Sequence, residues 1–354
     1  MHILEIDMRP FLFCLATGFA LTPALCAAQG DHSQLVRACD LVAASPFDPS
    51  RPADIVGVAP NKINTALALS PCQEALAAAP DDPRLQFQVG RIFYALKDFA
   101  KARSLFERAA AQGHGGAQGN LAAMYQLGQG GLAKDDQEAA RLYKLAADKG
   151  ILPAEVGLGS FYAEGRGDLG RDEREAARLF KHAADQGYAI AQVALGNFYR
   201  AGRGGLAKDE SEAVRLYKLA ADQGNGASQY TIGTLYWAGK GGLAKDENEA
   251  VRLIKAAADA GYILAQDSLQ NPYSVGIAKD EKDGARFFKL AAEQGSAEAQ
   301  YNLGTFYLDG IGGLSKDKNA ALKLFELAAD QGHLGAKAML CKISPGSSSP
   351  GYCK

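Results

Sequence analysis

Apolar residues recur along most of the chain at the spacing of an amphipathic α-helix. Residues 188–224 are representative: the first half carries apolar residues such as Leu195 on one helical face, and Gly202 then interrupts the pattern. A second apolar face follows Asp209, an N-cap residue with a glutamate three positions later, and it ends at Gly224. The pattern predicts two helices joined by a glycine-rich loop.

The same pattern recurs along the chain, and each copy ends with a short alanine-rich segment whose last residue is glycine. The intervals between these glycines are 37, 37, 37, 37, 34 and 37 residues. The glycines are Gly113, Gly150, Gly187, Gly224, Gly261, Gly295 and Gly332. Because one helical hairpin cannot bury its apolar face alone, tandem copies must stack on one another. The repeat therefore predicts an all-α solenoid.

The repeated pattern A-x-x-x-L-G-x-x-Y-x-x-G-x-G-G-L-x-K-D-x-x-E-A-x-R-L-Y-K-x-A-A-D-x-G resembles the Sel1-like repeat, with six copies over residues 114–332. Residues 81–113 have a shorter loop between helices and resemble a tetratricopeptide-type hairpin. The resemblance implies a right-handed superhelix of about seven hairpins with caps at both ends. In the fifth Sel1-like copy Gln270 replaces a glycine and Pro272 follows, so we expect a distorted hairpin.

The segments that flank the repeats are expected to act as caps. Residues 29–80 do not repeat: their first half is rich in proline and aspartate and is predicted to be loop-like, and their second half is predicted to be helical. We interpret this segment as a disulfide-tied N-terminal cap, with a small separate ligand module as the alternative. Residues 333–354 repeat only the start of a first helix and are predicted to form a C-terminal cap helix and tail.

Residues 1–28 have the order of a secretory signal peptide. An arginine precedes the apolar run FLFCLATGFAL, and small residues follow it. The preferred cleavage lies after Ala28, and the true start is Met1 or Met8. A lipid anchor on Cys26 is the alternative, although the preceding leucine is bulky for it. No later run is long enough to span a membrane, so we expect a soluble periplasmic or secreted protein.

Export changes the interpretation of the cysteines. Cys39, Cys72, Cys341 and Cys353 remain after cleavage, an even number suited to an oxidising compartment. Four cysteines allow three pairings; we expect Cys39–Cys72 and Cys341–Cys353, which close short loops at the two ends. Their spacing does not match that of a metal site.

Composition and charge exclude several classes of function. The 38 basic and 40 acidic side chains are balanced, which argues against a nucleic-acid groove. The segment GRGDLG follows a predicted helix, not a strand, so it is a repeat loop and not a dinucleotide site. The histidines have no metal-binding spacing. We therefore predict no catalytic residues, no metal and no cofactor.

One face of the first helix of each hairpin varies from copy to copy while the scaffold positions stay constant. This face lies at positions −3, +1 and +4 from the glycine within that helix. The candidate partner-binding residues on it are Asn197, Arg200, Tyr230, Thr234, Trp237, Asn271, Tyr301 and Thr305. Tyrosine, tryptophan and arginine dominate interface hot spots. Trp237 could equally pack against a neighbouring loop.

These observations predict a non-catalytic, exported scaffold that binds a protein or peptide through its concave side. The resemblance implies an adaptor, and some exported relatives regulate envelope or signalling systems. Two alternatives stay open. One is recognition of envelope glycan or peptidoglycan, with Trp237 stacking on a sugar. The other is binding or hydrolysis of β-lactams, although the related proteins linked to it carry paired cysteines within their repeats, which residues 114–332 lack.

Overall fold

The computed structural model describes residues 23–343, with side chains from residue 33 onward. Helices and connecting loops make up this part of the chain, without a β-strand. The helices that precede the first hairpin are α2 (Pro23–Ala43), the 3-10 helix η1 (Pro60–Lys62) and α3 (Thr65–Ala78). The prediction of an all-α repeat architecture is confirmed, and the handedness of the superhelix stays a prediction.

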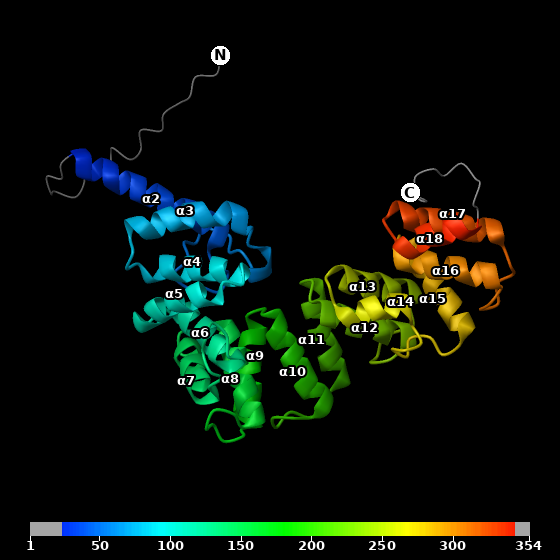
Figure 1. Cartoon of the computed structure of the whole chain (residues 1–354). Coiled ribbons are helices and arrows are strands. Elements are labelled where there is room, and N and C mark those ends of the chain that lie inside the picture. Colours follow the sequence, from blue (N-terminus) through cyan, green and yellow to red (C-terminus); the bar gives the residue numbers. More distant parts are fainter. Residues whose placement is uncertain (1–22, 344–354) are drawn as a thin grey trace, which may run out of the picture. The chain divides into compact units, whose positions relative to one another are not determined.

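Seven helical hairpins follow, and a last single helix closes the described part (Figure 1). Their bounds are α4 (Pro83–Ala95) and α5 (Phe99–Ala111), α6 (Gly115–Leu127) and α7 (Asp136–Ala147), α8 (Leu152–Glu164) and α9 (Glu173–Asp185), α10 (Ala189–Ala201) and α11 (Glu210–Asp222), α12 (Gly226–Ala238) and α13 (Glu247–Asp259), α14 (Ile263–Gln270) and α15 (Glu281–Glu293), α16 (Ala297–Asp309) and α17 (Lys318–Asp330), and α18 (Leu334–Ile343).

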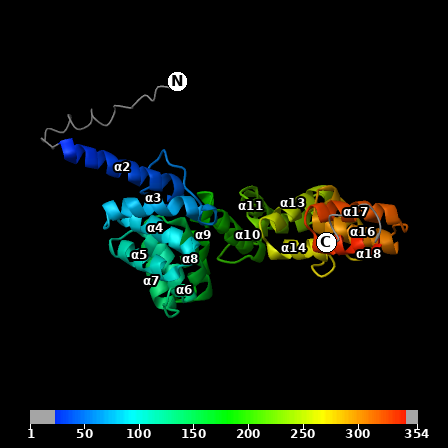
Figure 2. The same ribbon diagram turned by 45° about the horizontal axis from the view of Figure 1, so that its top comes forward.

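The chain divides into two compact units, residues 1–179 and 180–354, and α9 contributes to both. In the first unit, α2 lies along α3 in both views (Figures 1 and 2). In the second unit, α18 packs on α17 (Figure 2). Each unit has its own apolar core, in which many alanines alternate with larger aliphatic and aromatic side chains.

Local sequence sets the ends of the helices. The Asp209 side chain accepts a hydrogen bond from the Glu212 N–H at 2.9 Å, so α11 begins where the capping pattern predicts. Gly202, which ends α10, has a positive φ of 67°, a conformation that glycine adopts without strain. Gly196 has a packing role instead: a Cβ there would lie 2.8 Å from the Tyr217 ring. Glycine therefore lets α10 and α11 approach closely.

In five of the seven first helices, a glutamine connects the helix to the preceding hairpin; α8 carries Glu155 at this position. Gln192 donates from Nε2 to the Ala184 carbonyl, one of the last carbonyls of α9, and Gln118, Gln229, Gln266 and Gln300 make the equivalent bond. Each of these carbonyls also accepts the backbone N–H of the glycine that closes the repeat, at 2.9 Å, so the glutamine adds a second hydrogen bond at the helix end. The glutamine thus ties neighbouring repeats through polar groups as well as through apolar packing.

A second glutamine, at the end of the second helix, donates to the glutamine of the first helix in three hairpins. Gln223 donates to Gln192 Oε1 at 2.9 Å, Gln331 donates to Gln300 Oε1 at 2.8 Å, and Gln112 donates to Gln86 Oε1 at 3.1 Å. We call this arrangement of two side-chain amides in series the amide relay. In two hairpins Lys149 and Ala260 replace the second glutamine. There the buried Oε1 atoms of Gln118 and Gln229 have no hydrogen-bond partner.

The hairpin of α14 and α15 is distorted, as the sequence predicts. Helix α14 ends at Gln270 after eight residues, whereas the other first helices have thirteen. The Asn271 side chain then accepts hydrogen bonds from the N–H groups of Tyr273 and Ser274 and forms a tight turn. The Tyr273 ring lies so close to Gly284 of α15 that a side chain at this position would clash with it.

The N-terminal cap is more helical than expected. Residues 37–43, predicted to be loop-like, form the end of α2, and the helix predicted in the second half of this segment is α3. A disulfide joins Cys39 of α2 to Cys72 of α3, so this predicted pairing is confirmed. Cys341 is also disulfide-bonded, and Cys353 lies outside the described residues. By closing a loop across 33 residues, the Cys39–Cys72 bond stabilises the cap by about 3–4 kcal/mol in the chain-entropy account.

The interrupted relay gives a first prediction. Ala260→Gln supplies the missing donor to Gln229 Oε1, so the free energy of unfolding should rise by about 0.5–1.5 kcal/mol. Urea denaturation followed by circular dichroism measures the change. Ala260→Met, which has a side chain of similar length without the amide, is the matched control. An equal rise in both variants would show that packing, and not the hydrogen bond, is responsible.

Candidate functional site

The predicted partner-binding face lies within the second unit, on α10, α12 and α16, with Asn271 just beyond α14. Asn197, Arg200 and Asn271 are exposed, Tyr230, Thr234, Tyr301 and Thr305 are half-buried, and Trp237 is buried. The hydroxyls of Thr234 and Thr305 donate to the carbonyls of Thr231 and Asn302 in their own helices, at 2.8 and 2.7 Å. These two residues therefore offer a partner mainly their methyl groups.

On α10, the Asn197 side chain is held in place by its neighbours. Its Oδ1 accepts a hydrogen bond from the Tyr217 hydroxyl at 2.7 Å and another from Arg200 at 3.4 Å. Burial raises the pKa of the Tyr217 hydroxyl, and the nearby Arg200 opposes this effect. The phenol therefore stays protonated and remains a donor to Asn197.

On α12, Tyr230 belongs to an aromatic pair that extends to the next hairpin. Its ring centroid lies 5.5 Å from that of Tyr262. Ser268 Oγ lies 2.7 Å from the Leu264 carbonyl and 3.3 Å from the Tyr230 hydroxyl. Because the carbonyl takes the serine hydrogen, the Tyr230 hydroxyl can donate to Ser268 Oγ. We call Tyr230, Tyr262 and Ser268 the tyrosine cluster.

On α16, Tyr301 stacks on the imidazole of His333 with a centroid distance of 4.6 Å and an interplanar angle of 25°. His333 Nδ1 accepts from the Ala336 N–H at 3.0 Å and so caps α18. This places the ring proton on Nε2, which lies 3.0 Å from Glu298 Oε2. Tyr301, His333 and Glu298 form a partly exposed group that we call the histidine cluster.

Sequence reasoning found one tyrosine of each cluster but missed their partners. Tyr262 and His333 each follow the glycine that closes a repeat, and both positions are the N-cap of the next first helix. The local signal was thus present, because N-cap residues lie at the junction between neighbouring hairpins. The Asn271 side-chain oxygen holds the turn after α14, and its role in partner binding stays a prediction.

The expectation that Trp237 presents its indole on an open face is wrong. The side chain is 7% exposed and its ring packs edge-on against Phe287 of α15, with centroids 5.5 Å apart. The short α14 explains this position, because the first helix that would flank the last turn of α12 stops at Gln270. The indole fills the space against α15 and belongs to the core. The glycan alternative, which depended on Trp237, loses its stacking surface.

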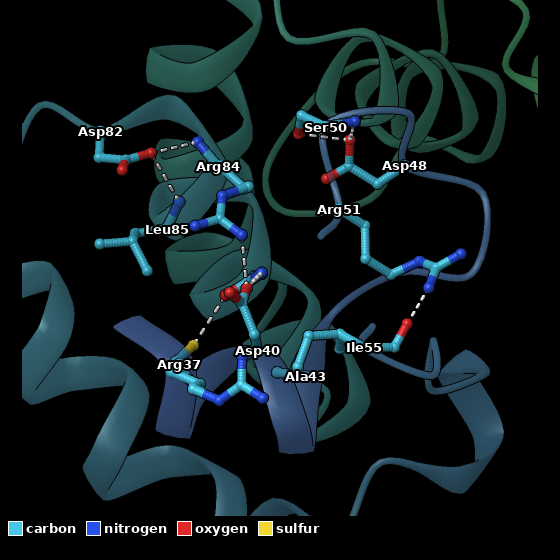
Figure 3. A network of polar contacts seen from close by, with 12 residues as sticks. Arg37, Asp40, Ala43, Asp48, Ser50, Arg51, Ile55, Asp82, Arg84 and Leu85 are labelled. Atoms are coloured by element: carbon cyan, nitrogen blue, oxygen red, sulfur yellow. Dashed lines mark hydrogen bonds and ion pairs between the residues drawn. The ribbon is translucent and has the colours of Figure 1, made fainter. Parts of the chain in front are cut away.

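A buried polar network in the first unit anchors the N-terminal cap (Figure 3). Asp40 Oδ1 accepts from Arg84 at 2.6 Å and from Gln88 at 2.7 Å. The buried Arg91 donates to the Ala43 and Val58 carbonyls, and burial lowers its pKa to about 10, so it remains charged at neutral pH. These contacts hold the loop after α2 on α4.

The same loop also reaches α6. Asp48 Oδ2 lies 3.3 Å from His114 Nε2, and both side chains are nearly inaccessible to solvent. Burial alone would raise the pKa of Asp48, but the neighbouring His114 and the hydrogen bonds from Ser50 outweigh it and hold this pKa below its usual value. Asp48 is therefore a structural anion. Over the residues whose side chains are described, no cluster of three or more histidine, cysteine or acidic side chains could hold a metal ion.

Comparison with protein families decides the identity of the repeats. The Sel1 repeat profile matches residues 86–114, 116–151, 152–188, 189–225, 226–262, 273–296 and 297–333. The chain belongs to the Sel1 repeat family. The Sel1 match includes the hairpin that the sequence analysis likened to a tetratricopeptide unit, and it omits the shortened α14. Sel1 repeats generally serve as non-catalytic scaffolds for protein interaction.

Several solved structures resemble this Sel1 repeat protein. A protective antigen of uropathogenic Escherichia coli with an SLR fold is 30% identical, with a TM-score of 0.47; the match covers 80% of this chain and 60% of the antigen. A Sel1 repeat protein from Oxalobacter formigenes is 28% identical, with coverages of 69% and 96% and a TM-score of 0.47. An immunity protein from Pseudomonas aeruginosa is 22% identical, with coverages of 57% and 75% and a TM-score of 0.39.

A comparison with curated protein sequences finds no match. Within residues 23–343, no helix of the Sel1 repeat protein combines the length and apolar character that crossing a membrane requires.

The position of Trp237 gives a second prediction. Trp237→Ala should lower the free energy of unfolding by about 3–5 kcal/mol, because it leaves a cavity against Phe287. Trp237→Phe keeps an aromatic contact and should lose much less. The urea midpoint, read by circular dichroism, separates the two variants. An alanine variant as stable as the native protein would mean that the indole lies on the surface.

Proposed function

We propose that this Sel1 repeat protein is an exported, non-catalytic scaffold that binds another protein or a peptide through the first-helix face of its second unit. The surface comprises Asn197 and Arg200 with the tyrosine cluster and the histidine cluster. It would act in an envelope or signalling process by holding its partner. The proposal starts from the repeat, in which this face varies from copy to copy while the scaffold positions stay constant.

The observation that carries the proposal is the pairing of aromatic and polar groups on this face. Tyr230 with Ser268 and Tyr301 with His333 each place a ring beside hydrogen-bonding atoms, and both tyrosines remain partly exposed. Protein interfaces are enriched in tyrosine and arginine, and such residues dominate binding energy. A partner could bury the rings while it bonds to the polar atoms beside them.

Preorganisation supports the same function. Asn197 is fixed by Tyr217, and Tyr301 is held against His333, so both side chains lose little rotamer freedom when a partner binds. Ordering side chains at an interface costs about 0.5–1.5 kcal/mol each, and prior ordering reduces that cost. A stacked helical scaffold suits this role because its helices position the side chains before the partner arrives.

Export is the second part of the proposal. The Cys39–Cys72 disulfide and the bonded Cys341 suit an oxidising compartment such as the periplasm. Cleavage after Ala28 would remove the apolar run and the first residues of α2, and it would leave Cys39 and its helix in the mature chain. The residues before 23, which hold most of the proposed signal, lie outside the described residues.

The binding proposal predicts the effect of truncating the two tyrosines. Crosslinking in the intact envelope followed by mass spectrometry identifies the partner, and the affinity of the purified partner is then measured by calorimetry. Tyr230→Ala combined with Tyr301→Ala should weaken binding by about tenfold or more, because two aromatic contacts are lost. Circular dichroism checks that the fold persists.

Leu327→Ala is the matched control for this experiment. It shortens an exposed apolar side chain on α17, a second helix outside the proposed face, and should leave the affinity unchanged. An equal loss in both variants would remove the face from consideration. Recovery of glycans instead of proteins in the crosslinking experiment would contradict the scaffold proposal.

Export predicts the mature terminus. Protein isolated from envelope or culture fractions should begin at Gln29 and should carry no free thiol under non-reducing conditions. Intact mass spectrometry with and without an alkylating reagent measures both properties. A full-length chain with alkylated cysteines, recovered from the cytoplasm, would overturn the export proposal.

A further inference from the structure

A groove of about 410 Å³ lies on the first unit, between α3, α4 and α5. Val89 forms its buried floor, and the half-buried side chains of Leu76, Phe93 and Leu105 form its walls. Lys101 and Ser104 lie at its exposed rim. The groove is separate from the first-helix face of the second unit.

At the groove, the first hairpin lacks an ion pair that five other hairpins share; α17, with Ala320 and Lys323 at the two positions, lacks it as well. In those hairpins a carboxylate in the first turn of the second helix binds an arginine three residues later. The pairs are Glu138–Arg141, Glu175–Arg178, Glu212–Arg215, Glu249–Arg252 and Asp283–Arg286. Lys101 and Ser104 stand at the corresponding positions of α5.

The arginine of the pair normally lies close to an aromatic ring of the first helix. Arg141 is close enough to Tyr125, and Arg215 to Tyr199, for the charge and the phenol to interact. Phe93 occupies the position of these tyrosines in α4. The short Ser104 side chain brings no guanidinium group to the Phe93 ring, whose cationic neighbour is Lys101 instead, and Phe93 and Ser104 both line the groove.

The only charged residue that lines the groove is a cation. The Lys101 ammonium lies 5.1 Å from the centroid of the Phe93 ring, and it also pairs with Asp98, the N-cap of α5, at 2.9 Å. Asp98 is not part of the lining. An apolar floor with a polar, cationic rim has the anatomy of a small protein-binding site, and it complements an anionic partner.

We infer that this groove binds a segment of a partner protein in which a large apolar side chain neighbours an aspartate or glutamate. The apolar side chain enters between Leu76, Phe93 and Leu105, and the carboxylate binds Lys101. The inference rests on the proposed scaffold function, but it concerns a second surface. The groove volume lies at the small end of the range for ligand sites, which suits one or two side chains.

The repeat itself provides the variant that tests this inference. Lys101→Glu combined with Ser104→Arg rebuilds on α5 the ion pair seen in five other hairpins, and it fills the groove with a residue pair that the fold already tolerates. Ala320→Glu combined with Lys323→Arg builds the same pair on α17, away from the groove, and is the matched control. Thermal denaturation confirms that both double variants fold.

The probe is a phage-displayed library of random dodecapeptides, panned against the full-length protein. Enriched peptides should carry a large apolar residue next to an acidic one. Measured by fluorescence anisotropy, their Kd should rise about tenfold or more in Lys101→Glu/Ser104→Arg and stay unchanged in the control. Affinity should also fall as salt is added, since the Lys101 contact is exposed.

Two results would overturn the inference. Peptides that bind both double variants equally would show that the groove is not their site. Groove-dependent binding of sodium palmitate, without enrichment of acidic peptides, would assign the groove to an acyl chain. Neither result affects the first-helix face, because the Tyr230 and Tyr301 variants test that face with a different partner and in a different unit.

Discussion

The fold depends on the burial of apolar helix faces that no hairpin can cover alone. The cores combine many alanines with large residues such as Phe106, Phe161 and Phe325, which are fully buried. Small side chains let the helices approach closely, and this close approach makes glycine necessary where a ring of the next helix crosses, as Tyr217 does at Gly196. Composition and architecture therefore have one cause, the stacking of thin helical layers.

This constraint divides each first helix into two parts. The side that faces the core is the same in almost every copy, because a changed volume there would disturb two neighbouring hairpins. The opposite side is free to vary, and it carries the tyrosine and histidine clusters. The groove beside Phe93 follows the same logic on the second helix, where one exposed ion pair has been exchanged for Lys101 and Ser104. Both the first-helix face and the groove therefore arise where exposed positions of the repeat vary while its core positions stay constant.

Features set by short-range contacts could be predicted from the sequence. Asp209 identified the start of α11, and the spacing of the cysteines suggested the Cys39–Cys72 bond, because both depend on local pattern or on adjacent elements. The position of Trp237 could not be predicted in this way. Its burial depends on a helix that ends early at Gln270, more than thirty residues further along the chain, and on the ring of Phe287.

The binding face was predicted only in part for the same reason. The repeat pattern could identify Tyr230 and Tyr301, since each lies three residues before the glycine within its first helix. Their partners Ser268 and His333 come from the following hairpin, so only the packed structure brings them together. The helical end of α2 was missed because prolines shortly after it dominate the local signal.

The amide relay also bears on how the array opens. Where two glutamines connect successive hairpins, separating them breaks buried hydrogen bonds as well as apolar contacts. Each unit contains one junction without the second glutamine, at Lys149 and at Ala260. Local unfolding begins where few interactions must be broken, so these two junctions should open, and admit a protease, more readily than the junctions with a complete relay. The relay thus makes layers with nearly the same fold differ in local stability.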